Sequence, residues 1–406
     1  MRVLIIGGGI GGLAAAAALR KLNIPHHVFE RAPRATEIGA GISMWPNAMK
    51  ALAWLGLADA VRRRGLIATD AHIRSMNGRS ITRADMLAIR DKLGAEFLMI
   101  HRAELLDALL EGVDPAAISW GKSLARVEQD DHAVTAHFDG GASERADLLI
   151  GADGLKSIVR AQAVDNTPPR PAGQTAYRGL VKFDHPAFPR GSVWEVWGPR
   201  ARVGITCLPD SHIYWWATHD SLRMTSEANP DHRRDLLQVF TSASGWCEPI
   251  EAMLRATDPA HILKHDLFDR APRRGWSNRR IVLLGDAAHP MTPNLGQGGC
   301  TAIEDGIVLA RCIQALHAAP ETQPNANGAS LDAANIARAL SRYERARFAR
   351  TASLVRQSRF LGWWGQRPAA WQCRVRDAIF SVISPLTFER SMMQFGAYDA
   401  GQVSLP

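Results

Sequence analysis

The sequence predicts an α/β fold: a three-layer domain with a parallel sheet, an inserted antiparallel β-sheet domain, and C-terminal helices. The first domain is predicted from two segments, 2–22 and 281–310. In each of them an apolar strand, a glycine turn and a helix occur in succession. A further observation locates the insertion, because residues 172–268 contain short apolar runs rich in Trp, Tyr and Val, separated by Pro and Gly. The two ends of the chain are therefore expected to build one domain around the middle.

The length of 406 residues also favours two coupled domains over one core. We expect the first domain at 1–171 and 269–330, with a small β excursion at 67–100. The inserted domain is expected at 172–268 and a helical region at 331–406.

Composition excludes several classes of protein. The net charge is +8, but the arginines are scattered and lack the interleaved aromatic residues of a nucleic-acid surface. Five cysteines without a C-x-x-C pair argue against a disulfide framework or a zinc site and favour a reducing, cytoplasmic location. No stretch approaches the roughly 18 apolar residues of a membrane span, so no stable membrane insertion is expected. The oligomeric state is left open.

The first motif is a dinucleotide-binding turn. A strand at 2–6 leads into the glycine run, in which Gly7, Gly9 and Gly12 have the G-x-G-x-x-G spacing, and the helix Leu13–Leu22 follows. Glycines let the backbone approach a pyrophosphate, and the helix start favours its negative charge. Glu30, after the next strand, is placed to accept hydrogen bonds from a ribose. This pattern predicts a Rossmann-like domain.

The second glycine unit, at 281–305, has the same order of strand, turn and helix. Its strand ends at Gly285-Asp286, and Pro290 and Pro293 exclude helix in the following loop. A glycine-rich turn at 296–299 then precedes a helix with apolar residues three and four apart. We expect this helix N-terminus to attract negative charge.

Other elements follow from local pattern. The remaining predicted strands are Ala71–Ser75, Ser80–Ala84, Val127–Gln129, Val134–Phe138, Ala146–Ile150, Thr175–Phe183, Ser192–Trp197, Arg202–Leu208, Ile213–Thr218 and Ile262–Leu267. The remaining predicted helices are Ala48–Leu55, Ala103–Leu110, Arg233–Phe240, 331–365 and Ala370–Ile383. The strand at 146–150 leads into Gly151-Ala152-Asp153-Gly154, with Ser157, Val159 and Arg160 following.

Together the three motifs resemble those of the single-component FAD-dependent aromatic hydroxylases, the group-A flavoprotein monooxygenases. The resemblance covers nearly the whole chain, and Gly298-Gly299-Cys300 with Glu304-Asp305 is similar to the branch that contains urate hydroxylases, alkyl-quinolone monooxygenases and zeaxanthin epoxidases. The cofactor-binding residues that it implies are Gly7, Gly9, Gly11, Gly12, Glu30, Arg31, Ser43, Arg102, Leu124, Asp153, Gly154, Asp286, Pro293, Gly296, Gln297, Gly298, Gly299 and Cys300.

The resemblance also implies which part of FAD each of these residues contacts. The first glycine turn and Glu30 hold the ADP half of FAD, Arg102 reaches its phosphate or adenosine side, and backbone near Leu124 touches the adenine. Asp286 binds the ribityl chain, and the loop Gly296–Cys300 lies by the isoalloxazine ring. Ser43 lies near the other side of the ring, and Asp153-Gly154 serves both FAD and the transient nicotinamide nucleotide.

The implied activity is that of an FAD-dependent monooxygenase. NADH or NADPH reduces the flavin, O2 forms a flavin C4a-hydroperoxide, and one oxygen passes to an aromatic or heteroaromatic small molecule. Neither a metal nor a nucleophilic cysteine is implied. Epoxidation of an alkene or terpenoid and O2-independent flavin dehydrogenation remain as alternatives.

Substrate contacts are expected on the inserted sheet. Arg202 and Tyr214 lie on neighbouring predicted strands and are similar in position to substrate-contacting residues of the urate-hydroxylase branch, so they are the candidate catalytic residues; Arg178 is a further substrate candidate. A structural Arg and a core Tyr are the alternatives. Asn294 departs from the urate branch, where an acid is expected. We interpret His289 as a hydrogen-bonded loop histidine, and the tryptophans at 194, 197, 215 and 216 as core residues rather than a pocket wall.

Overall fold

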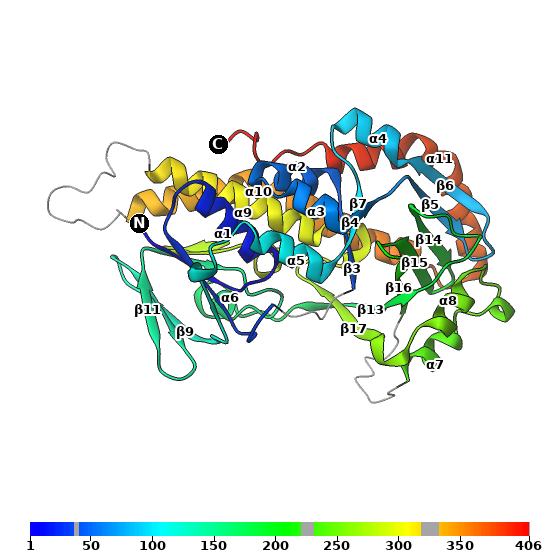
Figure 1. Ribbon diagram of the computed structural model, residues 1–406, viewed down its shortest axis with the longest axis horizontal. Coiled ribbons are helices and arrows are strands. Elements are labelled where there is room, and N and C mark those ends of the chain that lie inside the picture. Colours follow the sequence, from blue (N-terminus) through cyan, green and yellow to red (C-terminus); the bar gives the residue numbers. More distant parts are fainter. Residues whose placement is uncertain (36–39, 221–230, 318–332, 406) are drawn as a thin grey trace.

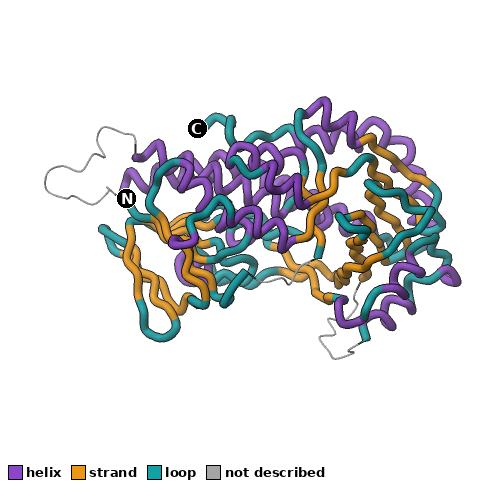
Figure 2. The backbone as a smooth tube through the Cα atoms, viewed as in Figure 1, coloured by secondary structure: helices purple, strands orange, loops and turns teal. Residues whose placement is uncertain are grey.

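The structure, a computed structural model, describes residues 1–35, 40–220, 231–317 and 333–405. Two lobes lie side by side along the long axis of the molecule, and helices run between them (Figures 1 and 2). The first lobe holds the N-terminal motif, and the second holds the β-sheet from the middle of the chain.

A six-stranded sheet forms the centre of the first lobe. Its strands, in the order β18-β19-β12-β1-β2-β8, are β18 (Ser277–Asn278), β19 (Ile281–Leu283), β12 (Leu148–Gly151), β1 (Val3–Ile6), β2 (His26–Glu30) and β8 (Ile118–Trp120). All neighbours pair in parallel except β18 with β19. Strands β1, β12 and β19 are completely buried, as a parallel sheet covered on both faces requires. The predicted parallel sheet and its composition from both ends of the chain are therefore present.

Helices cover one face of this sheet and a small sheet covers the other (Figure 1). The helices are α1 (Ile10–Lys21), α5 (Arg102–Leu110) and α9 (Gly298–His317); the small sheet contains β9 (Leu124–Gln129), β10 (Val134–Phe138) and β11 (Ser143–Ala146). Helices α1 and α9 touch at Gly306, where a Cβ would lie 2.6 Å from the backbone nitrogen of Ala15. This close contact brings the two nucleotide-type motifs together.

The second lobe is built on a seven-stranded sheet. Its strands, in the order β17-β13-β16-β15-β14-β5-β6, are β17 (Leu263–Asp269), β13 (Arg170–Lys182), β16 (His212–Asp220), β15 (Ala201–Cys207), β14 (Ser192–Gly198), β5 (Asp70–Ser75) and β6 (Ser80–Asp85). The hairpin β5–β6 was expected as an excursion of the first domain. Instead β5 pairs in parallel with β14 and extends the second sheet, because hydrogen bonding to the open edge of β14 satisfies both strands.

Shorter elements complete both lobes. They are α2 (Pro46–Leu55), α3 (Ala58–Arg64), α4 (Met86–Leu93), α6 (Ile158–Ala163), α7 (His232–Leu237), α8 (Ile250–Ala256), β3 (Gly41–Met44), β4 (Gly65–Ile67) and β7 (Leu98–His101). Side chains of α7 and α8 join the apolar core on one face of the seven-stranded sheet. The opposite face is turned toward the first lobe and carries the substrate candidates.

Two long helices connect the lobes. Helix α10 (Ala333–Gly365) begins in the core of the first lobe and ends against Arg202 of β15. Helix α11 (Ala370–Gly396) extends beyond the predicted end at Ile383. Within the described residues, neither these nor any other helix combines the length and apolar character needed to cross a bilayer.

Candidate active site

One cavity of about 710 Å³ lies between the glycine turns of the first lobe and the seven-stranded sheet. The predicted site residues that line it are Gly9, Gly11, Ser43, Arg102, Gly154, Arg178, Tyr214, Asp286, Pro293, Gly296, Gly298 and Gly299. The predicted residues that are not part of its walls are Gly7, Gly12, Glu30, Arg31, Leu124, Asp153, Arg202, Gln297 and Cys300. The fold thus brings twelve positions from distant parts of the sequence to one space.

The first glycine turn is shaped by contacts that exclude side chains. A Cβ on Gly12 would lie 1.9 Å from the carbonyl oxygen of Gly7, whose own φ is +110°. A Cβ on Gly9 would instead meet no atom within 4 Å. Gly9 therefore leaves open space at the N-terminus of α1, while Gly12 permits the tight turn. Glu30 lies against this turn, since its carboxylate accepts hydrogen bonds from the backbone N–H groups of Gly8 at 2.6 Å and Ala32 at 2.8 Å.

The turn Gly151-Ala152-Asp153-Gly154, the second of the three motifs along the chain, is held by hydrogen bonds within the protein. Asp153 accepts hydrogen bonds from the Ser157 hydroxyl at 2.5 Å and the Ile158 backbone N–H at 2.7 Å, at the start of α6. Burial raises the pKa of Asp153, and these donors oppose the shift. The buried Arg160 donates to the backbone oxygens of Ala287 at 3.0 Å and Ala288 at 3.1 Å. Through Arg160 this motif therefore contacts the loop after Gly285-Asp286, the third motif, and Gly154 lines the cavity beside that loop.

The glycine loop before α9 is closely packed against β3. A Cβ on Gly296, whose φ is +64°, would lie 2.8 Å from the Ser43 hydroxyl oxygen. The Cys300 thiol donates to the carbonyl oxygen of Ser43 at 3.5 Å. Burial raises the pKa of Cys300 to about 12, so the thiol stays protonated at neutral pH and is not a nucleophile. The Gln297 side chain faces away and accepts a hydrogen bond from Asn47 at 3.1 Å.

Charged groups of opposite sign meet in the cavity wall. Burial raises the pKa of Asp286, while His289 and Arg102 oppose this shift. Burial lowers the pKa of Arg102, and repulsion from Arg178 adds to that effect. A polar ligand that spans this wall would thus meet both an acceptor and donors.

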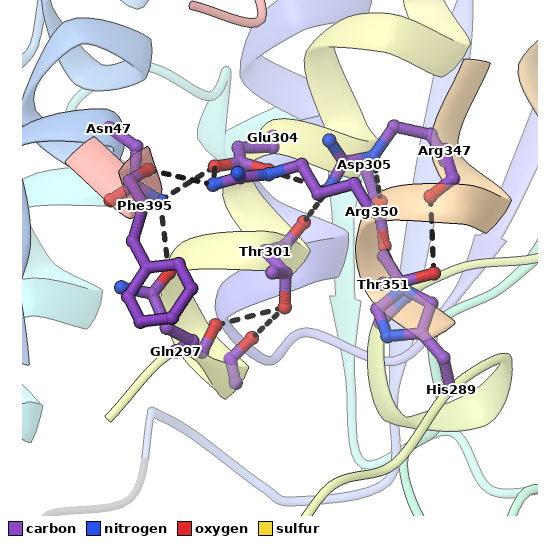
Figure 3. A network of polar contacts seen from close by, with 12 residues as sticks. Asn47, His289, Gln297, Thr301, Glu304, Asp305, Arg347, Arg350, Thr351 and Phe395 are labelled. Carbon is purple, nitrogen blue, oxygen red and sulfur yellow. Dashed lines mark hydrogen bonds and ion pairs between the residues drawn. The ribbon is translucent and has the colours of Figure 1, made fainter. Parts of the chain in front are cut away.

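A buried ion network, which sequence analysis missed, anchors the first two turns of α9 (Figure 3). Asp305 accepts hydrogen bonds from Arg347 at 2.6 Å, from His289 at 2.6 Å and from the Gly285 backbone N–H at 3.0 Å. Its neighbour Glu304 pairs with Arg347 at 2.6 Å. The interpretation of His289 as a hydrogen-bonded loop residue is confirmed. A signal existed in the sequence, because the two adjacent acids lie inside an otherwise apolar helical pattern and require buried cations.

The same network reaches the other helices. Arg350 donates to Glu304 at 2.8 Å and to the backbone oxygen of Phe395 on α11 at 3.1 Å. Asn47 of α2 donates to Glu304 at 2.6 Å. Helices α2, α9, α10 and α11 are therefore joined at the N-terminus that faces the cavity.

The charge on Asp305 makes stability depend on pH. Burial opposes its ionisation, but His289 and Arg347 outweigh burial and hold the pKa of Asp305 at about 2. The unfolded pKa is about 3.9, so the contribution is present above that value and is lost as pH falls toward 2. We expect the free energy of unfolding, measured with urea, to fall by roughly 2 to 3 kcal/mol between pH 5 and 2 because this group becomes protonated. The Asp305→Asn variant should show a shallower pH dependence; an unchanged slope would contradict the assignment.

Arg202 lies behind the cavity rather than in its wall. It is completely buried, donates to Glu195 at 2.8 Å and also donates to Asn294. Gly365 makes room for it, since a Cβ there would lie 2.9 Å from the Arg202 Cδ. Glu195 and Asn294 do line the cavity. Arg202 is therefore placed to orient two wall residues.

The sheet face that lines the cavity combines aromatic and polar groups. Trp216 lies over Gly204, where a Cβ would be 2.1 Å from the indole nitrogen, and it pairs across the sheet with Arg178. Tyr214 pairs with Thr206, a buried wall residue whose hydroxyl has no hydrogen-bond partner among the described residues. An unpaired buried hydroxyl is suited to a ligand.

The four tryptophans divide between core and wall. Trp197 and Trp215 are buried in the core, as predicted. Trp194 is buried in the same core, as predicted, and also contributes to the cavity wall, whereas Trp216 is half-buried and belongs to the wall. No cluster of His, Cys, Asp and Glu suited to a metal ion occurs in the described parts of the chain.

These residues fit a flavin dinucleotide. Gly9 leaves free space at one helix N-terminus, and Gly298 begins a second helix at the same cavity, where a Cβ would meet only Met291 at 3.9 Å. Helix N-termini stabilise the negative charges of phosphates and of a reduced flavin ring. The cavity volume also lies in the range of cofactor and ligand sites.

Comparison with known proteins agrees with this fit. Residues 1–342 match the family described as FAD binding domain. The chain is 38% identical to an aurachin C monooxygenase/isomerase of Stigmatella aurantiaca, covering 95% of this chain and 94% of that protein. It is 32% identical to an FAD-dependent urate hydroxylase of Klebsiella pneumoniae, covering 88% and 89%.

Solved structures have the same fold. The crystal structure of Klebsiella pneumoniae HpxO complexed with FAD and uric acid is similar with a TM-score of 0.87 and 28% identity, covering 100% of this chain and 98% of that one. A salicylate hydroxylase substrate complex is similar in fold, with a TM-score of 0.76 and 21% identity over 100% of this chain and 99% of the other. On its motifs, its cavity and these relatives, the chain belongs to the FAD binding domain family and is an FAD-dependent monooxygenase.

Proposed function

We propose that the protein hydroxylates an aromatic or heteroaromatic small molecule, with NADH or NADPH as electron donor and O2 as oxygen source. One oxygen atom enters the substrate ring, and the other leaves as water with the two electrons of the nicotinamide nucleotide. The observation that carries this proposal is the cavity of about 710 Å³, which has nucleotide-type glycine turns on one side and Arg178, Tyr214 and Trp216 on the other.

FAD, when bound, supplies the redox and oxygen chemistry. We propose that Gly7–Gly12, Glu30 and Arg102 hold its ADP half, and that Asp286 binds the ribityl chain. The N-terminus of α9, at Gly298, would stabilise negative charge on the ring. The side chains that fix this N-terminus, Glu304, Asp305 and Arg347, are buried.

The remaining cofactor assignments keep their predicted roles. Ser43, Pro293 and the loop Gly296–Cys300, including Gln297 and Gly299, are proposed to shape the ring site. Backbone near Arg31 and Leu124 is proposed to lie beside the adenosine. Asp153-Gly154 is proposed to serve both nucleotides, with Asp153 acting through the turn that it caps.

We assign the substrate to the sheet side of the cavity. Arg178 can donate to a carbonyl or anionic oxygen of the ring, and Trp216 can stack on it. Tyr214 is proposed to contact the substrate directly. Arg202 is proposed as a positioning residue that acts through Glu195 and Asn294. Relatives named for urate and for 6-hydroxynicotinate, from Klebsiella pneumoniae and Pseudomonas fluorescens, support a heteroaromatic substrate.

Turnover under isotopically labelled oxygen tests the reaction. The FAD-loaded protein should oxidise NADH or NADPH much faster when a suitable hydroxybenzoate, quinolone or purine is present. In ¹⁸O2 the product should carry one labelled atom on the ring. A labelled epoxide would favour the epoxidase alternative, and an unlabelled oxidised product would favour the dehydrogenase.

Replacing Arg178 with methionine tests the substrate side. Loss of a hydrogen bond from a charged donor costs about 1.5 to 3 kcal/mol, so KM for the substrate should rise about tenfold or more. FAD content should stay the same. The Lys182→Met variant removes an exposed cation from the same strand and should leave KM unchanged. Equal KM values for both variants would contradict the role of Arg178.

We also propose a cytoplasmic location. All five cysteines are free, which suits a reducing compartment.

A further inference from the structure

An apolar stripe faces solvent along helix α11. Its residues are Trp371, Val375, Ile379, Val382 and Ile383, which are 65%, 49%, 40%, 75% and 49% exposed. Their spacing of three and four places them on one side of the helix. Isolated exposed apolar residues are common, but five such residues along one face of a helix indicate an interaction surface. We call this set the α11 stripe.

Exposed aromatic residues at the end of α10 adjoin this helix in the chain. Phe360 is 58% exposed and Trp363 is 55% exposed. Their ring centroids lie 5.8 Å apart, and Trp364 lies 6.1 Å from Trp363. Trp and Phe are the side chains that prefer the boundary between lipid headgroups and acyl chains.

The charges along this surface have one sign. Between 351 and 383 the sequence contains five arginines and a single acid, Asp377. Arg376 is buried and Arg359 pairs with Asp269, so the positive charge at the surface comes from Arg356, Arg367 and Arg374. Asp377 is buried and accepts a hydrogen bond from Arg376 at 2.8 Å, so it contributes no exposed charge. Arg356 and Arg374 are exposed, and the guanidinium of Arg367 lies 3.7 Å from the centre of the Trp363 ring. Such a surface is complementary to a negatively charged partner.

A second cavity lies beside the exposed aromatic residues at the end of α10. Its volume is about 280 Å³, and Trp363, Gln366 and Arg367 form part of its wall. Thr292 belongs to its wall and also to the wall of the main cavity. Trp363 therefore lines a cavity that shares the wall residue Thr292 with the main cavity.

We propose that the α11 stripe, with Phe360 and Trp363, docks the protein reversibly onto the surface of an anionic lipid bilayer. The apolar stripe enters the headgroup region, and the exposed arginines pair with lipid phosphates. A second copy of the chain is disfavoured as partner, because pairing two such faces would bring arginines against arginines. Docking is independent of the proposed hydroxylation, since it requires no turnover.

Cosedimentation of the FAD-loaded protein with vesicles tests the proposal. Vesicles of equal parts phosphatidylcholine and phosphatidylglycerol should pellet the protein, and those of phosphatidylcholine alone should bind it much more weakly. Bound protein should be released by high salt, because the arginine attraction is screened. The double variant Ile379→Asp with Val382→Asp should lose binding at least tenfold, and Arg374→Glu should lose it several-fold.

Matched variants elsewhere separate this surface from general charge effects. Ile67→Asp alters an exposed apolar residue on β4, and Arg145→Glu reverses an exposed arginine on β11. Both should bind vesicles like the unmodified protein, and all variants should keep their FAD and melting temperature. Protein that stays in the supernatant with every vesicle would overturn the proposal. So would a dimer in solution that Val382→Asp converts to monomer.

Discussion

Replacing Arg347 with methionine is expected to lower the free energy of unfolding by about 3 to 5 kcal/mol. Arg347 is completely buried and pairs with both Glu304 and Asp305, which are also completely buried. Removing the cation leaves two carboxylates without their main counter-charge in a site that water cannot reach. Arg350 and His289 compensate only in part, because each contacts one acid. Urea unfolding at neutral pH measures the loss.

The control for this variant lies on the same helix. Arg345 is exposed and, among the described residues, donates to Ser341, so Arg345→Met should change stability by no more than about 0.5 kcal/mol. FAD retention should follow the same order, because Arg347 fixes the N-terminus of α9 and, through Asp305, the backbone of Gly285. An Arg347→Met protein as stable as Arg345→Met would show that the ion network does not hold the site together.

Replacing Gly12 with alanine is expected to give a protein that is purified without FAD. The new Cβ would lie 1.9 Å from the carbonyl oxygen of Gly7, far inside van der Waals contact, so the backbone of the turn must move. Overpacking of this kind costs about 1 to 3 kcal/mol of stability, and it displaces the backbone groups that face the pyrophosphate. The flavin absorbance of the purified protein and its unfolding free energy are the measurements.

Gly9→Ala is the informative partner of Gly12→Ala. At Gly9 a Cβ meets no protein atom, and the backbone has φ −79° and ψ −174°, which alanine adopts without strain. Its stability without FAD should therefore be unchanged. The methyl group would occupy space at the start of α1 that the pyrophosphate needs, so FAD affinity should fall at least tenfold, about 1.4 kcal/mol. Full FAD affinity in Gly9→Ala would place the dinucleotide elsewhere.

Local patterns were sufficient for the elements that are proposed to hold the cofactor. Gly7 and Gly296 have positive φ angles and Gly12 has a contact of 1.9 Å, which side chains at these positions would not permit. The apolar strands before the two turns are buried. Strand β10 has its predicted bounds, Val134–Phe138, because its alternation of buried and half-buried residues is a local property. The assignment of β5 and β6 to the first domain was wrong, because local pattern defines a hairpin but not the sheet edge that it joins.

The sequence by itself determined the two glycine turns and the helices that begin after them, since those features depend on residues close together in the chain. Only the tertiary structure decided which side chains reach the cavity. Arg202 was expected in the wall, yet Glu195 and Asn294 stand between it and the cavity. Arg347 was not expected to matter, yet it joins α10 to α9 across 42 positions of sequence. Ion pairs between distant segments depend on how helices pack, and the spacing of charges along one segment does not encode that packing.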